Sequence, residues 1–306
     1  MLLPLIMKRF YSTLITCICI TVIQAQQVHV SSGKVIRHAN FPSQFVPPRN
    51  VDVWLPDNYD ATKSYAVLYM HDGQMLFDAT TTWNKQEWQV DEHMGKLLQS
   101  GEIRDCIVVG IWNVPHLRHS EYFPAKAVPY IEKTLIDSLK KVEWESALPT
   151  SDAYLSFIVR ELKPFIDNNY ATKTDKANTF IGGSSMGGLI SLYAICEYPA
   201  VFGGAICMST HWQGSLKVLD DNISTGMLKY YRKHLPNPAT HKIYFDYGSE
   251  TLDTAYKPFQ LIMDKAMHKR GYTFEHWMTK EVPGADHSEL AWSARLEIPL
   301  VFLLAE

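Results

Sequence analysis

The chain has 306 residues, of which 46% are apolar and 20% charged, and its formal net charge is −3 at pH 7. These proportions are ordinary for a globular protein and exclude a chain that is mainly disordered. The small negative charge, without a basic stripe, argues against nucleic acid as a partner. The length fits one large α/β domain or two small ones.

The first 25 residues have the layout of a secretory signal peptide. Lys8 and Arg9 give a basic start, the run Leu14–Ile23 is apolar, and Ala25 is a small residue at a plausible cleavage point. The apolar run is shorter than the roughly 20 residues that a membrane-spanning helix needs. We therefore expect cleavage after Ala25, no stable membrane insertion of the remaining chain, and a secreted or periplasmic protein.

Beyond the signal segment, short apolar runs alternate with segments of helical periodicity. Tyr65–Met70 is a near-continuous apolar run, which is typical of a central parallel strand. This alternation predicts an α/β fold with a mostly parallel central sheet and helices on both faces, in a single domain over residues 26–306. The expected strands are Val51–Leu55, Tyr65–Met70, Cys106–Trp112, Ala177–Ile181, Gly203–Met208, Ile243–Tyr247 and Phe274–Met278, and the expected helices are Ala153–Asn168, Leu189–Glu197, Tyr256–Lys269 and Ser288–Phe302.

Residues 115–150 interrupt this rhythm. The segment is mixed in composition and contains Pro124, Pro129 and Pro149. It follows the expected strand Cys106–Trp112, so it starts at the carboxyl end of the sheet, where ligands bind in open α/β sheets. We expect it to form a loop-rich, cap-like insertion that shapes a substrate site.

The most specific motif is Gly183-Ser184-Ser185-Met186-Gly187, which lies between an expected strand and an expected helix. A sharp strand-to-helix turn of this type exposes the hydroxyl of its central serine, and its flanking glycines leave room for the tight backbone. The helix start also places backbone N–H groups beside that hydroxyl. Ser185 is therefore the predicted nucleophile, and Ser184 is only its neighbour.

A serine hydroxyl needs a base, and the base needs an acid that orients it. In folds with this motif the chain order is serine, acid, histidine. His287 follows the last expected strand and is the only histidine beyond it. The loop after Ile243–Tyr247 offers two acids. Asp253 is preferred because aspartate is the commoner choice, and Glu250 stays open as the alternative.

Acyl chemistry also needs donors for a developing oxyanion. The N–H of Met186 should be one donor, and the loop after the strand Tyr65–Met70 should supply the other, for which Gln74 is our choice. Gly73 is expected to let this loop approach a ligand closely. His71 and Asp72 precede the serine, so we assign them a loop-stabilising role.

His211 and Trp212 follow the strand Gly203–Met208 and are expected to line the substrate site. No metal or cofactor is expected, because His116 and His119 have metal-like spacing but no third ligand nearby. The three cysteines beyond the signal segment lie in apolar runs, which predicts buried free thiols at Cys106, Cys196 and Cys207.

Taken together, these stretches resemble the α/β-hydrolase family described as putative esterases. The family includes enterochelin esterases, S-formylglutathione hydrolases, mycolyltransferases, and the feruloyl and acetyl xylan esterases of carbohydrate esterase family 1. The resemblance rests on Met70–Gln74, Arg118–Glu121, Gly182–Gly188 and Pro283–His287. In several relatives the acid loop has the spacing Gly-x-x-Asp, and Thr251 occupies that place here.

This resemblance implies the α/β-hydrolase fold and a Ser-acid-His triad at Ser185, His287 and either Asp253 or Glu250, without a metal. The implied function is that of a secreted serine esterase. It would remove acyl groups from sugars or plant polysaccharides through an acyl-enzyme, with a small-molecule or polysaccharide ester as its partner. Two alternatives stay open: a siderophore trilactone esterase and an acyltransferase. A non-catalytic binding protein is disfavoured because all parts of the triad are present.

Overall fold

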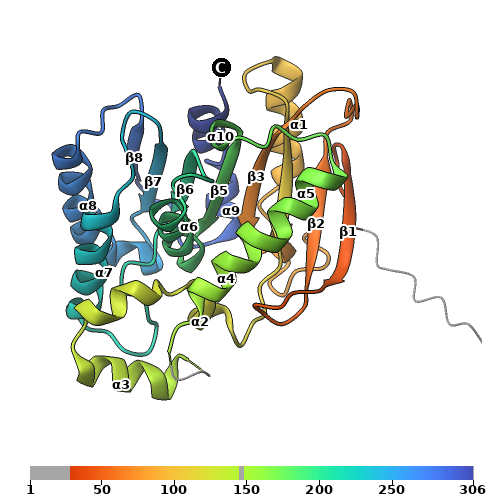
Figure 1. Cartoon of the computed structure of the whole chain (residues 1–306). Coiled ribbons are helices and arrows are strands. Elements are labelled where there is room, and N and C mark those ends of the chain that lie inside the picture. The colour runs from red at the N-terminus through yellow and green to blue at the C-terminus, as the bar shows by residue number, and fades with distance from the viewer. Residues whose placement is uncertain (1–27, 145–147, 306) are drawn as a thin grey trace, which may run out of the picture.

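The computed structural model describes residues 28–144 and 148–305, and the predicted signal segment lies outside this part of the chain. Eight strands form one sheet in the order β1-β2-β4-β3-β5-β6-β7-β8 (Figure 1). Strands β4, β3, β5, β6, β7 and β8 run parallel to one another. Strand β2 pairs antiparallel with β4, and β1 pairs antiparallel with β2 at the edge of the sheet. The strands are β1 (Lys34–Phe41), β2 (Arg49–Leu55), β3 (Ala66–His71), β4 (Cys106–Ile111), β5 (Thr179–Ser184), β6 (Gly204–Met208), β7 (Lys242–Gly248) and β8 (Trp277–Val282).

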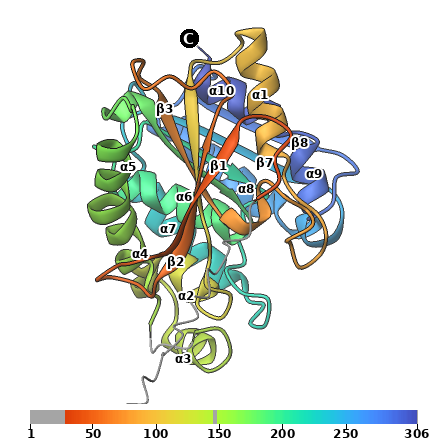
Figure 2. The ribbon, with the colours of Figure 1, turned by 90° about the vertical axis from the view of Figure 1, so that its right-hand side faces the viewer.

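Helices cover both faces of the sheet, as the edge-on view of Figure 2 shows. Successive side chains of a strand point to opposite faces, so Val67 and Tyr69 of β3 pack into one core and Leu68 and Met70 into the other. This confirms the predicted mostly parallel sheet between two layers. The helices are α1 (Val90–Ser100), α2 (Arg118–Tyr122), α3 (Lys133–Val142), α4 (Ser151–Phe157), α5 (Lys163–Asn169), α6 (Met186–Glu197), α7 (Asp221–His234), α8 (Lys257–Arg270), α9 (Glu289–Ser293) and α10 (Glu297–Leu304).

Most predicted elements differ from the structure by a few residues at their ends, and three differ by more. The last strand, expected at Phe274–Met278, is β8 at Trp277–Val282, because residues 274–276 form a turn in which Phe274 is 83% exposed. The helix expected at Ser288–Phe302 is split into α9 and α10. The helix expected at Ala153–Asn168 contains a π-helical turn between α4 and α5, just before Pro164, which has no N–H for the regular helical bond.

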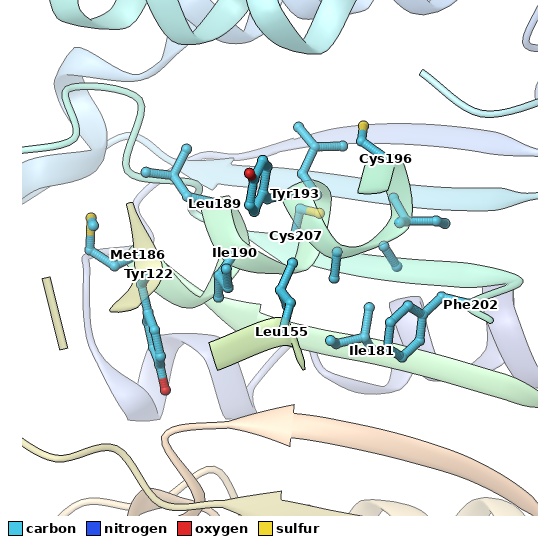
Figure 3. Close-up of a cluster of buried hydrophobic side chains, with 14 of the residues drawn as sticks. Tyr122, Leu155, Ile181, Met186, Leu189, Ile190, Tyr193, Cys196, Phe202 and Cys207 are labelled. Atoms are coloured by element: carbon cyan, nitrogen blue, oxygen red, sulfur yellow. The ribbon is translucent and has the colours of Figure 1, made fainter. Parts of the chain in front are cut away.

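Helix α6 is the centre of the larger core. All of its residues except Glu197 are buried, so it is apolar on every side. Figure 3 shows Leu189, Ile190 and Tyr193 of this helix packed among side chains from β5, β6 and α4. This packing fixes the N-terminal end of α6, which carries Ser185. The free cysteines Cys106, Cys196 and Cys207 are all buried, as predicted.

Residues 115–150, the expected cap, contain α2, the 3₁₀ turn Ala125–Tyr130 and α3. No helix within residues 28–144 and 148–305 is both long and apolar enough to cross a lipid bilayer.

A buried ion pair joins α2 to the sheet. The guanidinium of Arg49 on β2 contacts both carboxylate oxygens of Glu121, at 2.8 and 2.6 Å. Because Glu121→Gln would leave the buried cation without its counter-charge, we expect it to lower the free energy of unfolding by about 3–5 kcal/mol. Urea denaturation followed by circular dichroism measures this. The exposed pair of Lys63 and Asp105 is the control, since Lys63→Gln should cost below about 1 kcal/mol. Equal effects of the two variants would contradict the prediction.

Candidate active site

Ser185 occupies the turn between β5 and α6 in a strained backbone conformation, with φ 58° and ψ −123°. Residues with a side chain rarely adopt this conformation. Hydrogen bonds hold it in place: the Ser185 N–H donates to Met208 O at 2.9 Å, and its carbonyl accepts the N–H groups of Gly188 and His211 at 3.0 and 3.1 Å. A Cβ at Gly183 would lie 3.1 Å from backbone atoms of Gly187, which explains the glycine there.

The serine faces a cavity of about 670 Å³ at the carboxyl ends of the parallel strands. Loops that follow each of the parallel strands β3, β4, β5, β6, β7 and β8 form its walls. The predicted site residues are divided between this cavity and its surroundings. Ser185, Met186, Gln74, His211 and His287 line it, whereas Asp253, Glu250 and Trp212 do not.

The imidazole of His287 is oriented by Asp253. Its Nδ1 lies 2.6 Å from Asp253 Oδ1, and its ring packs edge-on against Trp292 with ring centroids 4.9 Å apart. Asp253 is fully buried in the 3₁₀ turn Thr251–Ala255. Glu250 is solvent-exposed and has no contact with the histidine among the interactions of the described residues. Of the two candidate acids, the structure therefore brings only Asp253 to His287.

A buried hydrogen-bond chain supports Asp253 from behind. Its Oδ2 accepts the N–H of Gly248 at 2.6 Å and the hydroxyl of Ser209 at 2.5 Å. The Ser209 oxygen in turn accepts bonds from Trp292 Nε1 and Arg295 Nη2. The sequence analysis did not find these residues, because they are brought together only by the fold.

Arg295 also pairs with Asp246, with Arg295 Nε 3.0 Å from Asp246 Oδ2. Both side chains are buried, and burial raises the pKa of Asp246 despite the nearby cation. Arg295 lies in the break between α9 and α10, so the split of the predicted helix is what points this side chain at β7. Asp246 is thus a structural partner of Arg295 and lies away from His287.

The residues expected to supply the oxyanion donors, Met186 and Gln74, line the same cavity as Ser185. Met186 is the first residue of α6, so its N–H has no intrahelical acceptor. Gln74 lies in the 3₁₀ turn Gly73–Met75, and its side-chain oxygen accepts the N–H of Asn113 at 3.2 Å. A Cβ at Gly73 would lie 2.5 Å from the backbone of Gly110, so this glycine lets the loop pack on β4; its close approach to a ligand stays a prediction.

Asp72 and Arg118 hold this loop. Arg118 Nε and Nη2 contact the two Asp72 oxygens at 2.8 and 2.7 Å, and Asn113 Nδ2 adds a third bond at 2.7 Å. Burial acts against the charged form, yet Arg118 keeps the pKa of Asp72 below its usual value. His71 is buried beside Tyr154, and burial lowers its pKa to about 3, so it is neutral.

His211 and Trp212 have different positions. His211 lines the cavity, its Nδ1 lies 2.8 Å from the hydroxyl of Tyr256, and burial lowers its pKa to about 3. Trp212, which we expected at the site, is instead fully buried in the core, where its indole donates to Gln260 Oε1 at 3.1 Å. Although Trp212 follows the buried strand β6 by four residues, its large apolar side chain packs into the core.

The rim of the cavity carries exposed apolar side chains. Trp83 is 84% exposed, and Leu216 and Leu252 are about half exposed. Asn84, next to Trp83, donates to Glu289 Oε2 at 2.7 Å, which ties this rim to the loop that bears His287. The exposure of Trp83 and its place in the cavity lining mark it as part of the site.

A nucleophile turn between strand and helix, set in a mostly parallel sheet with an oriented histidine after the last strand, defines the α/β-hydrolase class. Residues 44–300 match the sequence profile of the family described as "Putative esterase", so the chain belongs to this family and is a carboxylic ester hydrolase.

Individual relatives are distant. "Uncharacterized protein YbbA" of Bacillus subtilis is 24% identical over 205 residues, which cover 66% of this chain and 68% of that protein. A ferulic acid esterase superposes with a TM-score of 0.61 at 18% identity, covering 89% of this chain and 98% of its own. The enterobactin esterase of Shigella flexneri has a TM-score of 0.60 at 18% identity, over 90% of this chain and 60% of its own. At these identities the structures establish a shared fold.

Proposed function

We propose that the protein is a serine esterase with Ser185 as nucleophile, His287 as general base and Asp253 as the orienting acid. The observation that carries the proposal is the 2.6 Å contact between Asp253 and His287, beside a strained serine in the same cavity wall. Ser185 Oγ attacks the ester carbonyl carbon while His287 Nε2 takes its proton. The C–O bond then breaks, and the proton passes to the departing alkoxide.

Water completes the cycle. It adds to the acyl-enzyme and gives a proton to His287, and the carboxylic acid leaves as the proton returns to Ser185 Oγ. In both halves the carbonyl oxygen becomes negative. The N–H groups of Met186 and Gln74 are the donors we assign to it. The bond from Asp253 keeps the Nδ1 proton in place, so Nε2 is free to accept.

For the substrate we propose an ester between an uncharged acyl group and a hydroxyl of a sugar or plant polysaccharide. Among the described residues that line the cavity, histidines aside, Arg118 is the one cation, Asp72 neutralises it, and Glu289 adds a negative charge. A strongly anionic catecholate siderophore would meet no surplus positive charge here. The exposed Trp83 instead offers a flat apolar face, which suits an aromatic acyl group or a sugar ring.

A substrate panel tests this proposal. The purified protein would be assayed on a short aryl ester, methyl ferulate, acetylated xylan and a catecholate trilactone. We expect turnover of the aryl ester and the highest kcat/KM on ferulate or acetylated xylan. Preference for the trilactone would overturn the substrate class. Transfer of the acyl group to an added alcohol in place of water would make the enzyme an acyltransferase.

We also propose export of the protein through the segment 1–25. Lys8, Arg9 and the apolar run Leu14–Ile23 support this proposal. Sequencing the N-terminus of the protein from the extracellular or periplasmic fraction tests it, and a start at Gln26 is the expected result.

Removing the exposed Trp83 ring should slow the hydrolysis of large esters more than the hydrolysis of small ones. For Trp83→Ala we expect kcat/KM on methyl ferulate or acetylated xylan to fall about tenfold, equivalent to about 1.4 kcal/mol of lost contact. Hydrolysis of a short aryl acetate, which does not reach the rim, should stay within about twofold.

Phe274→Ala is the matched control, because Phe274 is equally exposed but lies outside this cavity. It should change neither reaction. Equal losses on the large and the small ester in Trp83→Ala would show that Trp83 supports the loop and does not contact the substrate.

A further inference from the structure

A second cavity, of about 460 Å³, lies where α7 and α8 pack beside the 3₁₀ turn Ala125–Tyr130. The two helices run side by side at one end of the molecule in Figure 1. This cavity, which we term the basic groove, shares no lining residue with the cavity at Ser185. Its charged lining residues are all cations: Lys229, Arg232 and Lys233 from α7, and Lys269 and Arg270 from α8, with Tyr130 and Ala266 completing the wall.

These cations are not neutralised by the protein. None of the five forms an ion pair with a carboxylate within the described residues. Lys233 Nζ lies 4.7 Å above the Tyr130 ring, and Arg270 Nε donates to Pro236 O at 3.4 Å. The basic groove is therefore a local concentration of positive charge in a chain whose net charge is −3.

Helix geometry explains only part of this cluster. Cations in the last turn of a helix interact favourably with its dipole, by about 0.3–1 kcal/mol each, and this covers Arg232 and Lys233 on α7 as well as Lys269 and Arg270 on α8. It does not cover Lys229, which lies one turn before Lys233, where like charges destabilise a helix. The helix dipole also does not explain why the basic ends of α7 and α8 line the same groove.

We propose that the basic groove binds an anionic polysaccharide, through carboxylates spaced along the polymer as in uronic acids. The proposal rests on the esterase function above and extends it with a docking site for the polymer that carries the ester. Exposed Lys and Arg side chains on flexible stems suit repeated, spaced charges.

Two other polyanions fit less well. Proteins that bind single-stranded nucleic acid combine cations with several aromatic faces for the bases, whereas the lining of the basic groove includes a single aromatic ring, Tyr130, with Lys233 over one of its faces. A flat anionic membrane would not reach into a concave groove as a single extended polymer does.

The test compares binding with catalysis in the same protein. Affinity electrophoresis of the mature protein through polygalacturonate, with a neutral mannan gel as reference, measures binding. We expect retardation in polygalacturonate only, weakened by salt. The double variant Lys229→Glu/Lys269→Glu should bind about tenfold more weakly. Lys34→Glu/Lys141→Glu is the matched control, with the same change in net charge at two exposed lysines outside both cavities.

Hydrolysis of a short aryl ester should be unchanged in both double variants, which separates this proposal from the esterase function itself. If both double variants weakened polygalacturonate binding equally, the effect would be one of overall charge, and the proposed binding at the basic groove would be overturned. Equal retardation in mannan, or tighter binding of single-stranded RNA than of polygalacturonate, would overturn the ligand class.

Discussion

Replacing Ser185 with alanine is expected to lower kcat for ester hydrolysis by about 10⁶-fold, to the residual rate that the oxyanion donors and substrate binding sustain. In the proposed mechanism, the change removes the protein atom that bonds to the acyl carbon. The fold should not suffer, because alanine experiences the same backbone strain at φ 58° as serine does. Steady-state kinetics on the best substrate of the panel, with the melting temperature as a measure of folding, gives the result.

Two further variants at this turn serve as controls. Ser184→Ala removes the neighbouring hydroxyl in the same motif and should keep most of the activity. Ser185→Gly should be as inactive as the alanine variant yet about 1 kcal/mol more stable, since glycine adopts this conformation without strain. If Ser185→Ala kept substantial activity, the nucleophile would have to be another residue of the cavity.

The second large effect is expected at the acid. Asp253→Asn should lower kcat by about 10⁴-fold, because an amide in this position no longer holds the Nδ1 proton of His287 and favours the wrong tautomer. The loss should appear in kcat and leave KM nearly unchanged, since Asp253 does not line the cavity.

Glu250→Gln provides the control for the acid. Glu250 is three residues away in the same loop but points into solvent, so this variant should match the wild type. If Glu250→Gln lost activity and Asp253→Asn kept it, the roles of the two acids would be reversed. Kinetics of the three proteins on one aryl ester decide the matter.

The sequence predicted well what depends on local pattern. The apolar run Tyr65–Met70 and the turn around Ser185 gave a central strand and the start of α6, because both features are encoded within a few residues. Chain order then predicted His287 at the carboxyl end of the sheet. The choice between Asp253 and Glu250 depends on how one short turn is oriented, and only the three-dimensional structure places Asp253 inward.

Features that depend on long-range packing were missed or mistaken. Nothing near Ser209 or Arg295 indicates that they meet behind the acid, because they lie 86 residues apart in the chain. Trp212 follows a strand at the expected edge, yet it turns into the core. Phe274 was expected to begin a strand but is 83% exposed, since an aromatic side chain carries no local signal of whether it will be covered.

The reactivity of the three buried thiols can be used to measure local unfolding of the protein. Burial raises the pKa of Cys106 to about 12 and also raises the pKa values of Cys196 and Cys207, so the thiolate form that reacts is scarce in the native state. A thiol reagent would therefore label these positions only when the sheet or α6 opens. Because Cys106 lies on β4 in one core and Cys196 near the end of α6 in the other, their separate labelling rates would compare how often the cores on the two faces of the sheet are exposed to water.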